Sequence, residues 1–136
     1  MGARSKYRKR ALDVLFESEM QSLELGGSLA ERLVTNHPPI NEYTIMLVEG
    51  VAGAQERIDG LLSEHSKDWS LDRMPGVDRN LLRLGAYEIL YVDDVPDAVA
   101  VSEAVELARE LSTDESPSFV AGVLGRLVEL KPTLQG

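Results

Sequence analysis

Apolar residues recur at intervals of three and four along almost the whole chain, and this spacing constrains the fold more than any other feature. Residues three and four apart lie on one face of an α-helix. The segments with this pattern are separated by glycine, proline or short polar runs, and none alternates apolar and polar residues between hairpin turns. The sequence therefore predicts an all-α fold of about seven helical pieces, in one domain of 136 residues.

The first two predicted helices have recognisable ends. A first helix, over about residues 4–23, is followed by Gly26-Gly27, which cannot easily continue it. Ser28 and Glu31 have the spacing of a capping box, in which each side chain bonds the backbone N–H of the other residue. The segment His37-Pro38-Pro39 is expected to stop the second helix, because proline lacks an N–H donor and restricts the residue before it.

A third predicted helix begins after Asn41, a suitable cap, and reaches about Leu62 over some five turns. Its interior contains Gly50, Gly53 and Gly60, and each glycine costs about 1 kcal/mol relative to alanine. Such glycines indicate either close packing against a neighbour or a local bend. The sequence does not decide between these two interpretations.

The second half of the chain predicts three further helices. Trp69 opens a short segment that is expected to form one helical turn and to bury the only tryptophan. Asp78 is expected near the start of the next helix, where its carboxylate suits the positive end of the dipole. Ser116 and Pro117 predict the cap and first position of the last helix, which should end near Lys131-Pro132.

Charge is divided unevenly along the chain. The first ten residues contain five cations and no acid, whereas the remaining residues contain 9 basic and 23 acidic side chains. A basic arm on an acidic body favours local attachment to a polyanion such as RNA. A frayed, solvated terminus is the alternative interpretation. The five cations are Arg4, Lys6, Arg8, Lys9 and Arg10.

Several classes of function are disfavoured by what the sequence lacks. It has no cysteine and only two histidines, His37 and His65, which are not spaced as metal ligands, so we expect no cofactor and no metal. It contains no phosphate-binding glycine loop and no marked pair of catalytic carboxylates, so we expect no enzyme. No apolar run is long enough to span a membrane, and the basic start lacks the apolar core of a secretory signal, so we expect a cytoplasmic protein.

Aromatic and hydroxyl groups accompany the basic arm. Tyr7 and Phe16 lie on the predicted first helix, so a base could stack on a ring while arginines hold phosphates. Burial in the core is the competing interpretation for both rings. Phe16 is the better candidate for stacking on a base, because it does not lie on the apolar edge of the helix that includes Tyr7. The segment from Ser112 to Phe119 brings hydroxyls and an aromatic ring to a helix start, although Asp114 and Glu115 oppose simple phosphate binding.

Five ordered blocks of residues resemble the NusB family of transcription antitermination factors over most of the chain. One departure is Ala121, where the family usually has asparagine, so an amide contact at that position is lost. The blocks are Arg10-Ala11 with Leu15-Phe16-Glu17, Val77-Asp78-Arg79 with Leu82-Arg83 and Tyr87-Glu88, Val95-Pro96, residues 103–108 (EAVELA), and Asp114-Glu115-Ser116 with residues 119–124 (FVAGVL).

The resemblance implies a fold of two three-helix subdomains, over about residues 1–66 and 69–132. It also implies a function without chemistry: binding of the boxA element of ribosomal RNA leader transcripts together with NusE, a small ribosomal subunit protein, within the transcription elongation complex. The residues that match RNA-contacting positions of the family are Arg4, Lys6, Arg8, Lys9, Arg10, Phe16, Glu115, Ser116 and Phe119.

The resemblance also implies a surface for NusE. Asp78 matches an acidic position that faces the partner, and Arg83, Tyr87 and Tyr91 are its expected neighbours. Core packing is the alternative for Phe119 and the two tyrosines, and pairing with Glu88 or Asp72 is the alternative for Arg83.

Other functions remain open at this point. Related helical domains occur fused to ribosomal RNA methyltransferases, and a chain of this kind could be a stand-alone recognition domain. A protein-protein scaffold is a second alternative, in which the arm binds an acidic partner or the body self-associates. A homodimer is compatible with the apolar helix faces.

Overall fold

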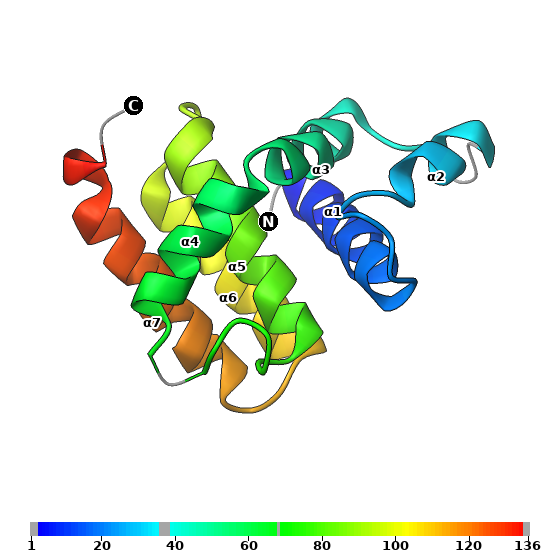
Figure 1. Cartoon of the computed structure of the whole chain (residues 1–136). Helices are drawn as coiled ribbons and strands as arrows, with labels where there is room; N and C mark the ends of the chain where they lie inside the picture. Colours follow the sequence, from blue (N-terminus) through cyan, green and yellow to red (C-terminus); the bar gives the residue numbers. More distant parts are fainter. Residues whose placement is uncertain (1–2, 36–38, 68, 135–136) are drawn as a thin grey trace.

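The computed structural model describes residues 3–35, 39–67 and 69–134. Within these ranges it has seven α-helices, one short 3-10 helix and no strand, which confirms the predicted all-α fold (Figure 1). The elements are α1 (Ala3–Met20), α2 (Leu29–Thr35), α3 (Glu42–Gly53), α4 (Gln55–His65), α5 (Gly76–Tyr91), α6 (Asp97–Leu111), α7 (Ser116–Leu130) and η1 (Lys131–Thr133).

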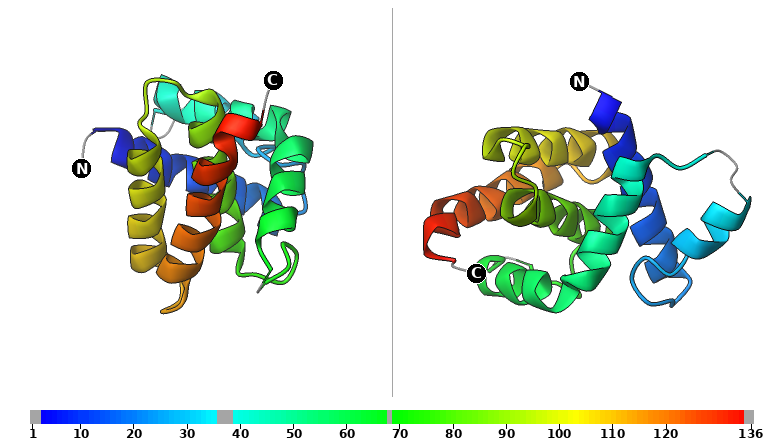
Figure 2. Two further views of the ribbon diagram at one scale, coloured as in Figure 1. Left: turned by 90° about the vertical axis from the view of Figure 1, so that its left-hand side faces the viewer. Right: turned by 90° about the horizontal axis from the view of Figure 1, so that it is seen from above.

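Helix α5 is the centre of the molecule. It packs against α1, α3, α4, α6 and α7, and for that reason most of its residues between Asp78 and Ile89 are buried. Helix α1 crosses beside α3 and α5, whereas α2 projects from the rest of the molecule (Figure 2). Two of the side chains on α2, Leu33 and Val34, are exposed.

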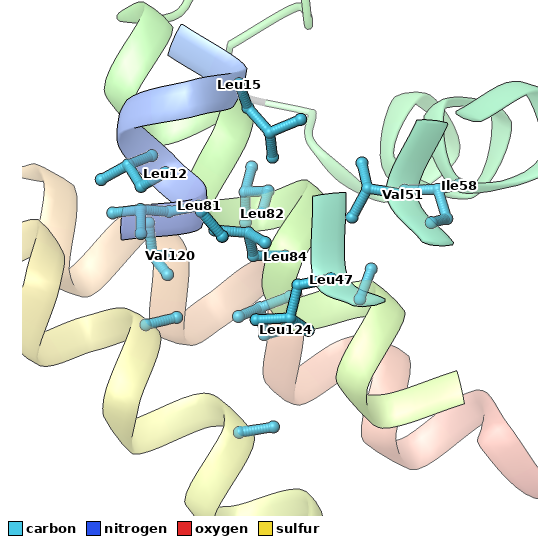
Figure 3. Packing of buried hydrophobic residues seen from close by; sticks show 14 of the residues in the cluster. Leu12, Leu15, Leu47, Val51, Ile58, Leu81, Leu82, Leu84, Val120 and Leu124 are labelled. Carbon is cyan, nitrogen blue, oxygen red and sulfur yellow. The ribbon is translucent and has the colours of Figure 1, made fainter. Parts of the chain in front are cut away.

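The buried apolar side chains form one cluster to which all seven helices contribute, and Figure 3 shows part of it. Leu15 of α1, Leu47 of α3, Leu82 of α5 and Leu124 of α7 are all fully buried in it. Each such leucine stabilises the fold by about 1.5–3 kcal/mol relative to an exposed one. The division into two subdomains stays a prediction; α4, which precedes residue 66, packs against α5 and α7.

The two interpretations of the glycines near residue 50 apply to different positions. The predicted third helix is divided into α3 and α4 at Ala54, which has φ −108° and ψ 14°. Gly50 allows close packing, because a Cβ at that position would lie 2.1 Å from Cζ of Tyr87. Gly53 and Gly60 have nothing within 4 Å of such a Cβ, so they are not packing sites. The bend therefore falls beside Gly53.

The predicted caps are only partly correct. Asn41 does cap α3, since its Oδ1 accepts a 2.7 Å hydrogen bond from the Tyr43 N–H. The capping box at Ser28 is wrong: its hydroxyl bonds Ser18 Oγ and the Val14 carbonyl instead. The cap at Ser116 is also wrong, because this residue is the first of α7 and its side chain is buried.

The boundaries differ in three further places. Helix α1 ends at Met20, three residues before the predicted end, and turns lead from there to Gly26, whose φ of +80° favours glycine. The segment after Trp69 forms turns and not a helix. His37 and Pro38, expected to stop the second helix, lie outside the described residues; α2 ends at Thr35.

Candidate nucleic-acid interface

The basic arm is a helical part of α1 and lies against acidic side chains of the body. Arg4 forms an ion pair with Asp94 at 3.0 Å, and Lys9 forms one with Glu110 at 2.8 Å. Lys6 is exposed and has no such partner in the part of the chain that the structure describes. The arm is thus neither frayed nor detached, and Arg4 and Lys9 lie next to carboxylates that compete with any anionic ligand.

Arg8 differs from the other cations of the arm because it is buried. Its Nε donates to both carboxylate oxygens of Glu88 at 2.9 Å, and its Nη1 lies 3.2 Å from Glu103. Burial works against the charged guanidinium, but the hydrogen bond and the charge of Glu88 outweigh it, so the pKa of Arg8 is raised. The Tyr43 hydroxyl also donates to Glu88, and burial together with that bond raises the pKa of Tyr43. Arg8 therefore holds α1 to α5 and α6.

A groove of about 440 Å³ lies between α1 and α6. Its lining contains three cations and three carboxylates: Lys6, Lys9, Arg109, Glu103, Glu106 and Glu110. Of these cations, Arg109 was not predicted from the sequence. No sequence pattern marks Arg109, because this residue lies among acidic residues on α6 and pairs with Glu106. Of the other predicted cations, Arg10 is half-buried on α1 and does not line this groove.

The second predicted RNA region starts with a loop that Asp78 holds in place. Asp78 is fully buried and accepts hydrogen bonds from the hydroxyls of Ser112 at 2.5 Å and Ser116 at 2.8 Å. The Ser116 hydroxyl also accepts a bond from the Thr113 N–H at 3.2 Å. Neither Asp78 nor Ser116 therefore presents a free polar group, and both act on the shape of the loop.

The exposed part of this region is formed by Glu115 and Phe119. Glu115 is exposed, and Phe119 is half-buried with its ring centroid 5.0 Å from that of Trp69. Trp69 was predicted to lie in the core, with no connection to Phe119. The only sequence signal for the pairing was the aromatic character of two residues that lie fifty positions apart.

Phe16 lies at the junction of α1 and α5. It is half-buried, and its Cε1 is 2.9 Å from the place that a Cβ on Gly76 would occupy. Beside it, Glu19 accepts a 3.0 Å hydrogen bond from Arg79 Nε. Burial opposes the charge of this carboxylate, but the hydrogen bonds from Arg79 and Asn80 and the charges of Arg79 and Arg83 outweigh burial, so the pKa of Glu19 is lowered.

The residues predicted to contact NusE are not equivalent. Arg83 is buried and donates to both carboxylate oxygens of Asp59 at 2.9 Å, so its partner is neither Glu88 nor Asp72. Tyr87 and Tyr91 lie with their ring centroids 5.1 Å apart. Tyr91 is 40% exposed and its hydroxyl accepts a hydrogen bond from Arg57 at 2.9 Å. Of the four predicted residues, the two tyrosines are the ones that reach the surface.

Metal binding and membrane insertion find no support in these ranges. No group of three or more acidic or histidine side chains in the described part of the chain could hold a metal ion. Likewise, none of the helices within the described residues is long and apolar enough to cross a membrane.

The arrangement can be compared with known proteins. The family model described as the NusB family matches residues 5–129, which run from the first turn of α1 almost to the end of α7. The chain belongs to the NusB family. The match includes every predicted site residue except Arg4.

Relatives within the NusB family are similar over their full length. The chain is 56% identical to the transcription antitermination protein NusB of Streptomyces coelicolor, with 99% of each chain covered. It is 58% identical to the protein of that name from Nocardioides sp., with 98% of this chain and 99% of the relative covered. The relatives are therefore chains of the same extent.

Solved NusB structures confirm the fold. NusB from T. maritima is 30% identical and superposes with a TM-score of 0.82, covering 94% of this chain and 92% of the other. A structure described as antitermination factors NusB and NusE in complex with double-stranded RNA matches with a TM-score of 0.79 at 28% identity, covering 93% and 96%. The NusB fold in that complex is thus close to the one seen here.

Proposed function

We propose that this chain is a transcription antitermination factor that binds RNA together with NusE and performs no chemistry. The observation that carries this proposal is the full-length similarity of 56–58% to antitermination proteins. The complex of a structurally similar NusB with NusE and RNA supports the same partners. The RNA that we propose is the boxA element of ribosomal RNA leader transcripts, in single-stranded form.

The RNA surface that we propose has two parts. The first is the groove between α1 and α6, where Lys6, Lys9 and Arg109 offer charge to phosphates. Arg4 and Arg10 extend the basic side of α1, and Phe16 adds an aromatic ring further along this helix. Arg8 contributes by fixing α1 to the body.

The second part is the start of α7, with Glu115 and Phe119 at the surface. Asp78 and Ser116 support this part of the surface from the protein interior, because their hydrogen bond fixes the loop that leads into α7. In this proposal both residues affect RNA binding through the position of the loop. A phosphate contact at the helix start is weakened by Asp114 and Glu115, so base recognition suits this part better.

The NusE surface that we propose lies on α5, at Tyr87 and Tyr91 with Arg57 of α4 beside them. Exposed aromatic residues are common anchors of protein interfaces. The acidic character of the body suits a basic ribosomal protein, because opposite charges speed and orient association. Arg83 supports this surface by tying α5 to α4 through Asp59.

The decisive experiment is fluorescence anisotropy of a labelled boxA RNA titrated with the protein, with and without NusE, at several salt concentrations. A scrambled RNA tests sequence specificity, and a boxA duplex tests strandedness. We expect boxA to bind more tightly than either control, NusE to strengthen binding, and affinity to fall as salt rises.

Two results would contradict the proposal. Equal binding to all three RNAs would leave only a general affinity for polyanions. No RNA binding, together with a mass that rises with protein concentration in light scattering, would instead favour a protein scaffold or homodimer.

A further inference from the structure

Tyr43, at the start of α3, contacts the basic arm at several points and is not part of the proposed RNA surface. The guanidinium carbon of Arg4 lies over its ring, 4.3 Å from the centroid, and that of Arg8 lies 6.0 Å from it. Both distances are within the range of a cation–π contact. The Tyr43 hydroxyl donates to Glu88, the buried partner of Arg8. One tyrosine therefore joins two cations of the arm to the body.

The start of α3 is itself fixed to α1. The Asn41 side chain caps the helix by accepting a hydrogen bond from the Tyr43 N–H. The next residue, Thr44, is fully buried, and its hydroxyl donates to the Tyr7 carbonyl of α1 at 2.9 Å. Helix α3 packs against both α1 and α5. The half-buried ring of Tyr43 is therefore held in a defined position relative to the arm.

The contacts of Arg4 leave part of its guanidinium available. Its Nη1 and Nη2 each donate to Asp94, at 3.4 Å and 3.0 Å, and these bonds use two of its five N–H groups. Its side chain makes no other hydrogen bond within the described residues. The Nε–H and one N–H on each terminal nitrogen remain. A guanidinium can thus hold a carboxylate on one edge and offer another edge to a phosphate oxygen.

The position of Arg4 matters because a long side chain loses rotamer freedom when it binds a ligand. The ion pair with Asp94 is weak support on its own, since the two side chains are 42% and 67% exposed. The carboxylate also opposes an approaching phosphate, although Arg4 matches its charge and salt screens it. The Tyr43 ring adds an uncharged contact from a fixed helix. A guanidinium already held over this ring loses less freedom when a phosphate binds.

We propose that Tyr43 is a positioning residue of the RNA-binding arm: its ring holds the Arg4 guanidinium so that the edge not bound by Asp94 meets a phosphate of the RNA. Tyr43 acts on the RNA through Arg4. The site lies beside the groove between α1 and α6, because Ser5, the residue after Arg4, lines that groove. This inference rests on the proposed function, because it requires that the chain binds RNA.

A double-mutant cycle between Arg4 and Tyr43 tests this role. The affinity for a labelled boxA RNA is measured by anisotropy, without NusE, for the wild type, Arg4→Ala, Tyr43→Met and the double variant. Methionine is apolar and flexible enough to fill the space, and it lacks the ring. We expect Tyr43→Met to lower the affinity about two- to fivefold, because the ring can favour the held position of Arg4 by no more than the free energy of one exposed cation–π contact. In the Arg4→Ala background the same substitution should change the affinity little.

Two further variants separate positioning from a general loss of structure. Tyr43→Phe keeps the ring and removes the hydroxyl that reaches Glu88, so it should keep the RNA affinity of the wild type even where stability falls. Ile45→Ala is the matched control, since this half-buried α3 side chain packs against the core. It should lower stability and leave RNA affinity unchanged. For Arg4→Ala, the slope of log affinity against log salt concentration should decrease in magnitude by about 0.7, the value for one phosphate contact with a single strand.

The wild-type protein allows a second measurement by NMR. Protons that lie over an aromatic ring resonate upfield of their ordinary position, so the side-chain resonances of Arg4 report on its contact with Tyr43. We expect an upfield shift of these resonances in the free protein and its retention at saturation with boxA RNA. Because this measurement needs no variant, a folding defect in Tyr43→Met, visible by circular dichroism, does not affect it.

The outcomes separate this inference from the proposed function. If the wild type binds RNA and Tyr43→Met lowers the affinity equally in both backgrounds, the positioning role is overturned and RNA binding stands. The same holds if Arg4→Ala changes neither affinity nor salt slope, or if RNA abolishes the upfield shift, because Arg4 would then leave the ring. Unchanged or higher affinity of Tyr43→Met also overturns the role. No anisotropy change with the wild type overturns both proposals.

Discussion

Arg8 donates from one nitrogen to both carboxylate oxygens of Glu88 at 2.9 Å, and both side chains are almost completely buried. Removing one partner of such a pair leaves the other charge uncompensated, at a cost of about 3–5 kcal/mol. We therefore expect Arg8→Leu to lower the free energy of unfolding by about this amount in urea titrations. Lys6→Leu, an exposed control on the same helix, should change it by less than about 0.5 kcal/mol. A stable Arg8→Leu protein that has lost only RNA affinity would instead make Arg8 a direct RNA contact.

The ion pair between Lys9 and Glu110 predicts that removing the Glu110 carboxylate raises the affinity for RNA. Both side chains are exposed, so the pair itself adds little to the stability of the fold. Glu110→Gln frees Lys9 and removes a negative charge from the groove between α1 and α6. We expect RNA affinity to rise about two- to fivefold at low salt, measured by anisotropy, while stability stays nearly unchanged. Glu129→Gln is the control, because this exposed carboxylate lies on α7 outside the groove. An equal rise in that variant would indicate net charge alone.

The helices could be predicted from the sequence because each depends on local apolar spacing. The positions of α5, α6 and α7 follow directly from Pro75-Gly76, Pro96 and Pro117. The predicted caps at Ser28 and Ser116 were wrong, because the hydroxyl of each serine forms hydrogen bonds with a segment that is distant in the sequence. No local sequence pattern indicates that Ser116 bonds the carboxylate of Asp78, because the two residues lie 38 positions apart.

The candidate site was less predictable for the same reason. The sequence identified a run of cations in residues 4–10, but pairing with α5 and α6 decides which of them face solvent. Arg8 and Lys9 are adjacent in the chain and have opposite environments, one buried and one exposed. The contact between the rings of Trp69 and Phe119 depends on how the turn segment before α5 packs against α7, which the periodicity of the sequence does not encode.

The position of Asp78 predicts that replacing this residue lowers both the stability of the fold and the affinity for RNA. Asp78→Ala leaves the buried hydroxyl of Ser116 and the half-buried hydroxyl of Ser112 without their carboxylate acceptor, which should cost about 1–3 kcal/mol. Because the loop before α7 is then no longer fixed, we expect RNA affinity to fall as well. Thermal unfolding and anisotropy measure the two effects, with Asp114→Ala, an exposed residue of the same loop, as the control. Unchanged stability with weaker NusE binding would instead support a direct partner contact by Asp78.

Glu19 predicts a specific dependence of stability on pH. Its pKa is lowered in the folded protein, so its contribution to stability is present above the ordinary glutamate pKa of about 4.3 and is lost as the pH falls through the lower folded value. We expect the free energy of unfolding to fall with decreasing pH in this acidic range. Glu19→Gln should show a smaller fall, because the amide does not titrate. Equal slopes for the two proteins would show that Arg79 does not stabilise the Glu19 carboxylate.

The close approach of Gly50 to Tyr87 predicts opposite effects for two similar substitutions. Gly50→Ala places a methyl group where the tyrosine ring lies, 2.1 Å from Cζ, and should lower the free energy of unfolding by about 1–3 kcal/mol. Gly60→Ala lies inside α4 with nothing within 4 Å of the new Cβ, so improved helix propensity should raise stability by up to about 1 kcal/mol. Urea unfolding of both variants measures the difference. Because Tyr87 must move in the first variant only, NusE affinity should fall for Gly50→Ala and stay constant for Gly60→Ala; constant affinity in both would remove Tyr87 from the proposed NusE surface.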